Sequence, residues 1–147
     1  MSKRILITGS AGFIGYHLAR KLIELNFQVI GFDNLNSYYD VSLKEARLEQ
    51  LNKLSFEKKS YWSFVKGDLE NSNELNAIFK KFNPSIIVHL AAQAGVRYSI
   101  SNPKAYINAN IIGFQNILEC SKEFNIEHLI YASSSSVYGG NSNIPFS

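Results

Sequence analysis

The sequence predicts an α/β protein built on a doubly wound parallel sheet. Short apolar runs alternate along the 147 residues with segments in which apolar side chains recur at helical spacing. Three glycines spaced three apart, Gly9, Gly12 and Gly15, follow the first apolar run. Polar or small residues follow each of the five apolar runs, which places them together at the carboxyl edge of a parallel sheet, where ligands bind.

The first strand, helix and second strand predict a site for NAD. Residues 5–7 form the strand, and Gly9 allows a turn that a side chain would obstruct. Gly12 lets backbone N–H groups approach a pyrophosphate at a helix N-terminus, and Gly15 permits close packing of that helix. The next strand, residues 29–32, leads into Asp33, whose carboxylate can accept from both hydroxyls of an adenosine ribose. A 2′-phosphate would meet a like charge there and no arginine follows, so the sequence favours NAD over NADP.

The next elements are predicted from spacing. The first helix is expected to carry four apolar residues on one face: Ile14, Leu18, Leu22 and Leu25. Residues 34–41 are expected to form a loop, residues 43–54 a charged helix and residues 61–65 a third strand.

Asn71 is predicted to cap a helix, because Glu74 follows it three residues later. Four residues at helical spacing are expected to form the buried stripe of this helix: Leu75, Ile78, Phe79 and Phe82. The fourth strand, residues 86–88, is continuously apolar, as expected for a strand covered on both faces.

Asn102 and Pro103 mark the start of a long helix. Four apolar residues are spaced along it: Ile107, Ile111, Phe114 and Leu118. A fifth strand is expected over residues 128–131. Right-handed crossovers between the strands make the sheet parallel, so residues 1–147 are expected to form one Rossmann-like, NAD-binding domain.

Composition excludes several classes of protein. The net charge is only +3 and the lysines are scattered, so nucleic-acid binding is not expected. No apolar run reaches membrane-spanning length, and the first four residues lead into a strand rather than a signal peptide. The lone Cys120 excludes a disulfide framework or a cysteine-based metal site; we expect it to fill core space in a cytoplasmic protein.

These motifs resemble the NAD-dependent epimerase/dehydratase family, which comprises extended short-chain dehydrogenase/reductases that act on nucleotide sugars. Five segments carry the resemblance: residues 8–15, 33–35, 67–69, 89–92 and 136–139. Within the family, three stretches are most similar to UDP-glucuronate 4-epimerases: residues 33–41, 91–99 and 131–136.

The resemblance implies which residues hold NAD. Phe13 and Ile14 would lie under the pyrophosphate with the three glycines. Four further groups would contact the rest of the cofactor: Asn34 and Asn36 with Asp33 on the adenosine side, Asp68 and Leu69 beside the adenine, Leu90, Ala91, Ala92 and Gln93 along the middle, and Asn110 near the nicotinamide or the sugar. The alternative for Asp68 is a turn residue that begins the next helix.

The resemblance also implies a nucleotide-sugar substrate, a UDP-hexose or UDP-uronate. Ser134 would hydrogen-bond the reacting sugar hydroxyl, and Ser135 and Ser136 would face the hexose. The alternative for these serines is a flexible loop. Arg97 would bind the diphosphate or a uronate carboxylate, unless it forms a surface or structural salt bridge. His89 is more typical of a packed core histidine, so it is given no catalytic role.

In the family, a tyrosine beside a lysine removes the proton from the C4 hydroxyl while NAD takes the hydride and returns it to the other face of a 4-keto sugar. A serine suits this site because its hydroxyl can both donate and accept. Related dehydratases carry an Asp-Glu pair directly after the Ser134 position. This chain has Ser135 and Ser136 there, which favours epimerisation.

The Tyr-x-x-x-Lys pair of the family lies some two dozen residues beyond the serines, past Ser147. Tyr138 cannot replace that tyrosine, because Ser142 stands four residues later. We therefore expect the N-terminal part of a longer, homodimeric enzyme, inactive alone, with an incomplete sheet and no C-terminal substrate domain. Two alternatives stay open: a stand-alone NAD-binding module without turnover, or part of a nucleotide-sugar dehydratase or decarboxylase.

Overall fold

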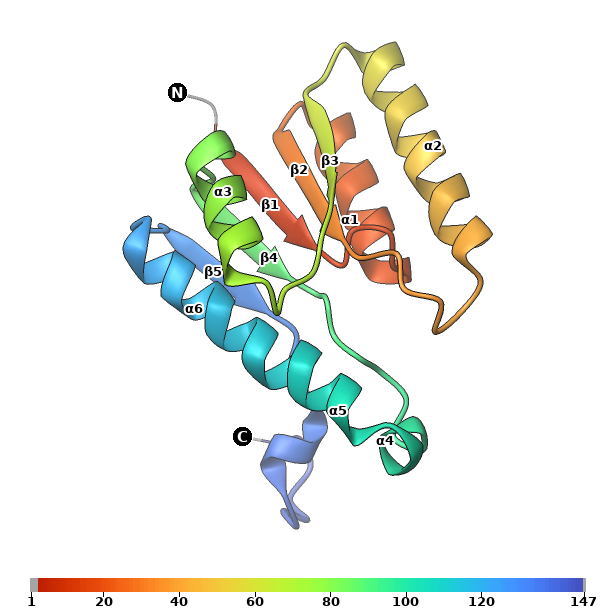
Figure 1. The fold of residues 1–147 in the computed structure, drawn as a ribbon, viewed down its shortest axis with the longest axis vertical. Coiled ribbons are helices and arrows are strands. Elements are labelled where there is room, and N and C mark those ends of the chain that lie inside the picture. Colours follow the sequence, from red (N-terminus) through yellow and green to blue (C-terminus); the bar gives the residue numbers. More distant parts are fainter. Residues whose placement is uncertain (1–2, 147) are drawn as a thin grey trace.

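A computed structural model describes residues 3–146, which contain one five-stranded sheet (Figure 1). The strands occur along the chain as β1 (Arg4–Thr8), β2 (Gln28–Asp33), β3 (Trp62–Lys66), β4 (Ile86–His89) and β5 (His128–Tyr131). They lie in the order β3-β2-β1-β4-β5, and every neighbouring pair is parallel. The predicted parallel sheet and all five strands are confirmed.

Helices cover both faces of the sheet. The main ones are α1 (Phe13–Glu24), α2 (Val41–Lys58), α3 (Ser72–Phe82) and a long helix composed of α5 (Pro103–Tyr106), the π-helical segment η1 (Ile107–Ile112) and α6 (Gly113–Glu123). Contacts join α1 to α2 and α3 to α6. Alternate residues of β1 enter separate cores: Leu6 packs with α3 and α6, whereas Ile5 and Ile7 pack with α1 and α2. The sheet is therefore doubly wound, as predicted.

Helix α3 has the predicted cap and core face. The Asn71 side chain accepts from the Glu74 N–H at 3.3 Å, which satisfies one of the free donors at the helix start. The four residues of the predicted stripe are all buried: Leu75, Ile78, Phe79 and Phe82.

The predicted apolar face of α1 is confirmed at Leu18 and Leu22, which are partly buried and pack against the core, and it is wrong at its two ends. Ile14 and Leu25 are exposed, whereas the buried positions are Gly15, Tyr16, Ala19 and Ile23. A Cβ added at Gly15 would collide with the Gly9 carbonyl oxygen, so α1 lies very close to the preceding turn. The closest approach of the helix is thus made at a small residue, while Leu18 and Leu22 still pack against the core.

The long helix begins at the predicted Pro103 and continues to Glu123, but its buried side chains differ from the spaced apolar set. Ile107, Ile111 and Leu118 are exposed, while Ile117 and Cys120 are buried with Gly113. The π-helical segment contributes to this difference, because it interrupts the regular helical repeat on which the spacing depends. Cys120 fills core space as predicted, and burial raises the pKa of its thiol to about 11.

Two short helices complete the described structure: α4 (Tyr98–Ser101) after β4, and the 3₁₀ helix η2 (Ser135–Tyr138) after β5. The described residues do not include Met1, Ser2 and Ser147. The expectation that the first four residues are not part of a signal peptide therefore lies partly outside them. Within residues 3–146, no helix is both long and apolar enough to cross a membrane.

Candidate functional site

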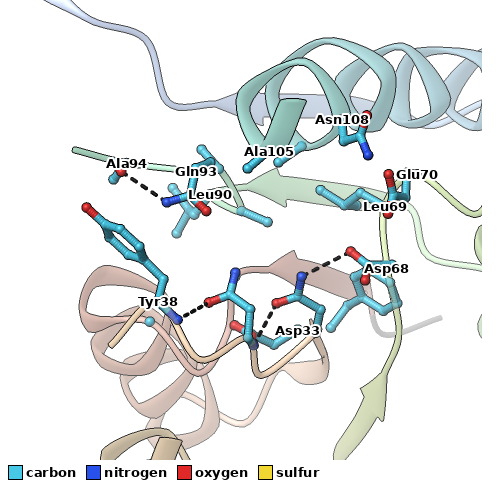
Figure 2. A pocket seen from close by; sticks show the side chains of 18 of the residues that line it. Asp33, Tyr38, Asp68, Leu69, Glu70, Leu90, Gln93, Ala94, Ala105 and Asn108 are labelled. Atoms are coloured by element: carbon cyan, nitrogen blue, oxygen red, sulfur yellow. Dashed lines mark hydrogen bonds between the residues drawn. The ribbon is translucent and has the colours of Figure 1, made fainter. Parts of the chain in front are cut away.

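A groove of about 410 Å³ lies at the carboxyl edge of the sheet, where the strand order reverses between β1 and β4. Asp33 and Tyr38 face Leu90 and Gln93 across it (Figure 2). Eleven of the predicted cofactor residues line the groove: Gly9, Gly12, Asp33, Asn34, Asn36, Asp68, Leu69, Leu90, Ala91, Ala92 and Gln93.

The glycine turn forms the floor of the groove. Gly9 has φ +71°, and a Cβ there would lie 2.8 Å from the Ala91 nitrogen, so only glycine fits the close approach of the two strand ends. Gly12 begins helix α1 without any side-chain cap. The first N–H groups of α1 are therefore not capped by a side chain, and their partial positive charge suits an anion such as a pyrophosphate.

Asp33 is 8% exposed and its carboxylate is held by two backbone donors. Oδ2 accepts from the Ala11 N–H at 3.1 Å, and Oδ1 accepts from the Leu35 N–H at 2.9 Å. Each oxygen can accept a further hydrogen bond, because a carboxylate has about four acceptor sites. The side chain is thus fixed at the end of β2 and can still accept from two vicinal hydroxyls.

A chain of hydrogen bonds shapes the loop after Asp33 (Figure 2). The Asn34 amide donates to Asp68 Oδ1 at 3.0 Å, and Asn34 Oδ1 accepts from the Asn36 N–H at 3.0 Å. The Tyr38 N–H donates to Asn36 Oδ1 at 3.4 Å. Asp68 also starts the turn into α3, since its carbonyl accepts from the Asn71 N–H. The two roles considered for Asp68, groove residue and turn residue, are therefore compatible.

Asn110 does not line the groove, but it holds the segment that does. It lies in η1, and its amide makes hydrogen bonds to both the N–H and the carbonyl of Gln93. Asn110 is therefore placed to position the wall that follows β4.

The groove also contains residues that the sequence interpretation did not select, among them Tyr38, Tyr39 and Lys44. Lys44 is 3% exposed, and its ammonium donates to the Asn36 carbonyl at 2.7 Å and to Asn36 Oδ1 at 2.9 Å. Burial lowers the pKa of Lys44, while the charge of Asp33 raises it. One signal was available, because Lys44 shares a helical repeat with the buried Leu48 and Leu51.

The remaining predicted residues lie outside the groove lining: Phe13, Ile14, Gly15, Arg97, Asn110, Ser134, Ser135 and Ser136. Phe13 and Ile14 are exposed on the first turn of α1. Within residues 3–146 Arg97 forms no salt bridge. The Ser134 hydroxyl accepts from the Ser136 N–H at 3.2 Å and caps η2. The roles assigned to these residues stay predictions.

His89 is a buried core residue, as expected. It is 7% exposed, its ring stacks on Phe114, and Nδ1 lies 2.8 Å from the Thr8 hydroxyl. Burial lowers the pKa of His89 to about 4, so the ring is neutral near pH 7.

Comparison with known proteins identifies relatives over nearly the whole chain. The GDP-mannose 4,6 dehydratase family matches residues 6–147. The chain is 58% identical to Protein CapI of Staphylococcus aureus, over 98% of this chain and 41% of that protein. It is 48% identical to a probable UDP-glucuronate 4-epimerase of Rhizobium meliloti, over 97% of this chain and 40% of that protein.

Among solved structures, the fold is similar to UDP-glucose-4-epimerase from Stenotrophomonas maltophila, determined with bound NAD and formylated UDP-arabinopyranose. The TM-score is 0.81 at 26% identity, over 98% of this chain and 40% of that one. The chain thus spans about 40% of the length of these relatives. The family match over residues 6–147, the doubly wound sheet and the glycine turn lead to one conclusion: the chain belongs to the GDP-mannose 4,6 dehydratase family of NAD-dependent epimerases and dehydratases.

Proposed function

We propose that this chain is the NAD-binding part of a nucleotide-sugar 4-epimerase, with a UDP-uronate as the substrate class and UDP-glucuronate as the first candidate. The observation that carries the proposal is the groove, in which the glycine turn and the fixed carboxylate of Asp33 lie along one sheet edge. The likeness to a probable UDP-glucuronate 4-epimerase supports the choice of sugar.

The residues of the groove fit NAD by their chemistry. The uncapped start of α1 suits the pyrophosphate, and Asp33 suits the adenosine ribose. Leu69, Leu90 and Ala91 supply apolar surface for the adenine and the middle of the cofactor. The chemistry that bound NAD would supply is the acceptance of a hydride from C4 of the sugar. The groove residues of this chain would bind and orient the dinucleotide.

We assign the substrate contacts to the segments after β4 and β5. Ser134 would hydrogen-bond the C4 hydroxyl, Ser135 and Ser136 would face the hexose, and Arg97 would bind an anionic group. Arg97 and the three serines are exposed in the described structure, so their side chains are accessible to a sugar nucleotide. We also infer a homodimer of the longer protein. The exposed Ile107, Ile111 and Leu118 on the long helix support this inference.

Two alternatives give different results. A stand-alone module would bind NAD, and its native gene product would have a mass of 16.6 kDa. A dehydratase or decarboxylase would convert its substrate without inversion at C4. A reading frame that continues past Ser147 with a Tyr-x-x-x-Lys pair would support the epimerase. A cytoplasmic location, inferred from the lone cysteine, stays a prediction.

The experiment is a calorimetric titration of the chain with NAD, in parallel with an assay for inversion of UDP-glucuronate. We expect NAD binding and no turnover by the 147 residues alone, because they carry no Tyr-x-x-x-Lys pair after the serines. Asp33→Ala should weaken NAD binding by about 1.5–3 kcal/mol, since charge-assisted hydrogen bonds are lost. Unchanged affinity in that variant, with its fold intact by circular dichroism, would refute the ribose assignment.

A further inference from the structure

Two cationic side chains of α2, Lys44 and Arg47, lie near the Asp33 end of the groove: Lys44 lines it, and Arg47 contacts the lining residue Tyr39. They are three residues apart, so they share one face of the helix. The Lys44 ammonium lies 4.4 Å from the centre of the Tyr39 ring, and the Arg47 guanidinium donates to the Tyr39 hydroxyl at 3.5 Å. Tyr39 lines the groove and therefore connects both cations to it.

Both cations also contact the groups that surround the Asp33 carboxylate. Arg47 donates to the Ala11 carbonyl at 3.0 Å. The N–H of Ala11 in turn donates to Asp33 Oδ2. Lys44 donates to Asn36, in the loop that begins after Asp33. Of the two positive charges, the Asp33 carboxylate can balance one.

We propose that Lys44 and Arg47 form a latent site for the 2′-phosphate of an NADP-type dinucleotide, which the Asp33 carboxylate blocks. The inference rests on the proposed NAD site, because the adenosine ribose must lie against Asp33 for its 2′ position to face the cations. A phosphate dianion accepts strong hydrogen bonds from guanidinium and ammonium groups, whereas a carboxylate repels it.

A latent phosphate site gives the preference for NAD a different physical basis. The sequence favours NAD partly because no arginine comes directly after Asp33. In the structure, however, Arg47 of α2 donates to the Ala11 carbonyl in the glycine turn. Preference for NAD then depends on one carboxylate rather than on a lack of positive charge. Removing that carboxylate should allow a 2′-phosphate to replace Asn36 as an acceptor for Lys44.

The test compares NAD and NADP affinities by calorimetry, using the full 147-residue chain and variants checked by circular dichroism. Asp33→Asn should bind NADP at least about tenfold more tightly than the wild type does. Adding Lys44→Met or Arg47→Met to Asp33→Asn should each remove about tenfold of this affinity. Lys53→Met, an exposed lysine on the same helix, is the matched control and should leave the gain unchanged.

Other results would overturn the proposal. It fails if folded Asp33→Asn binds NAD but gains no NADP affinity, or if the gain survives loss of both cations. If Asp33→Asn does not fold, Asp33→Ser replaces it in the same comparison and must show the same gain in NADP affinity, which Lys44→Met or Arg47→Met must again reduce. A wild-type chain that binds neither dinucleotide would refute the proposed NAD-binding function. A wild-type chain that binds NAD, with an Asp33→Asn variant that gains no NADP affinity, would refute only the latent phosphate site.

Discussion

Asn110 holds both backbone polar groups of Gln93. Asn110 Oδ1 accepts from the Gln93 N–H at 2.8 Å, and the Asn110 amide donates to the Gln93 carbonyl at 3.0 Å. Asn110 lies in the π-helical segment of the long helix, whereas Gln93 belongs to the groove wall after β4. The irregular helix therefore positions a loop that has no secondary structure of its own.

We expect Asn110→Ala to release this wall and to weaken NAD binding. Loss of the two bonds leaves the Gln93 groups without these partners, at a cost of about 1–3 kcal/mol for each group that stays buried. The measurement combines NAD titration with urea unfolding. Gln115→Ala, an exposed amide farther along the long helix, is the control and should change neither quantity. Equal affinities in both variants would show that Asn110 does not position the groove.

Acid should destabilise the fold through His89. Burial lowers its pKa from 6.5 to about 4, so the unfolded chain takes up the proton first as the pH falls. The contribution of neutral His89 to the free energy of unfolding is fully present above pH 6.5. It should decrease from there toward pH 4, by up to about 3 kcal/mol. His89→Phe should flatten this decrease in urea unfolding at several pH values.

The control for His89 is Leu75→Ala, which removes buried volume and no titratable group. It should lower the free energy of unfolding by about 2–5 kcal/mol at every pH and keep the wild-type dependence. An unchanged pH dependence in His89→Phe would assign the acid sensitivity to other groups.

Gly95→Ala should disturb the mouth of the groove. Gly95 has φ +90°, and an added Cβ would collide with the hydroxyl of Tyr38, which lines the groove. We expect a loss of about 1–3 kcal/mol in stability from the backbone strain, together with weaker NAD binding. Gly139→Ala is the matched control, because Gly139 also has a positive φ, +60°, and nothing lies within 4 Å of a Cβ there. Similar effects of the two substitutions would argue against a specific contact.

Asn71→Ala should lower the free energy of unfolding by about 1 kcal/mol, because the Glu74 N–H loses its cap. Ser72→Ala, at the first position of the same helix, serves as the control and should change stability less. Chemical denaturation measures both, and a smaller effect of Asn71→Ala than of Ser72→Ala would contradict the capping role.

The parts of the fold that could be predicted are those in which local pattern and packing agree. Helix α3 has a cap and an uninterrupted stripe, and both were located correctly because its whole apolar face is covered by the sheet and α6. Helix α1 follows the same reasoning only in its middle, where Leu18 and Leu22 pack against the core, because Ile14 and Leu25 at its two ends extend beyond the part that the sheet covers. The long helix differs because a π segment cannot be inferred from apolar spacing.

The site shows the same division. The glycines and Asp33 could be located because each lies next to a strand end and has a local signature. Lys44, which lines the groove, and Arg47, which contacts its lining residue Tyr39, were missed, since both extend from a helix whose orientation depends on tertiary packing. The substrate serines stay a prediction, because Ser134 belongs to an exposed segment at the end of the described chain.

The contact between the Gly9 turn and the segment after β4 has a consequence for folding. Thr8 pairs with His89, so the groove joins segments that are 81 residues apart in sequence. A folding intermediate with β1, α1 and β2 formed would hold all three glycines and Asp33, yet it would lack the opposite wall. Such a pairing of distant segments is slow to form. The dinucleotide would therefore bind only after β4 has joined the sheet, and its binding would report that folding is complete.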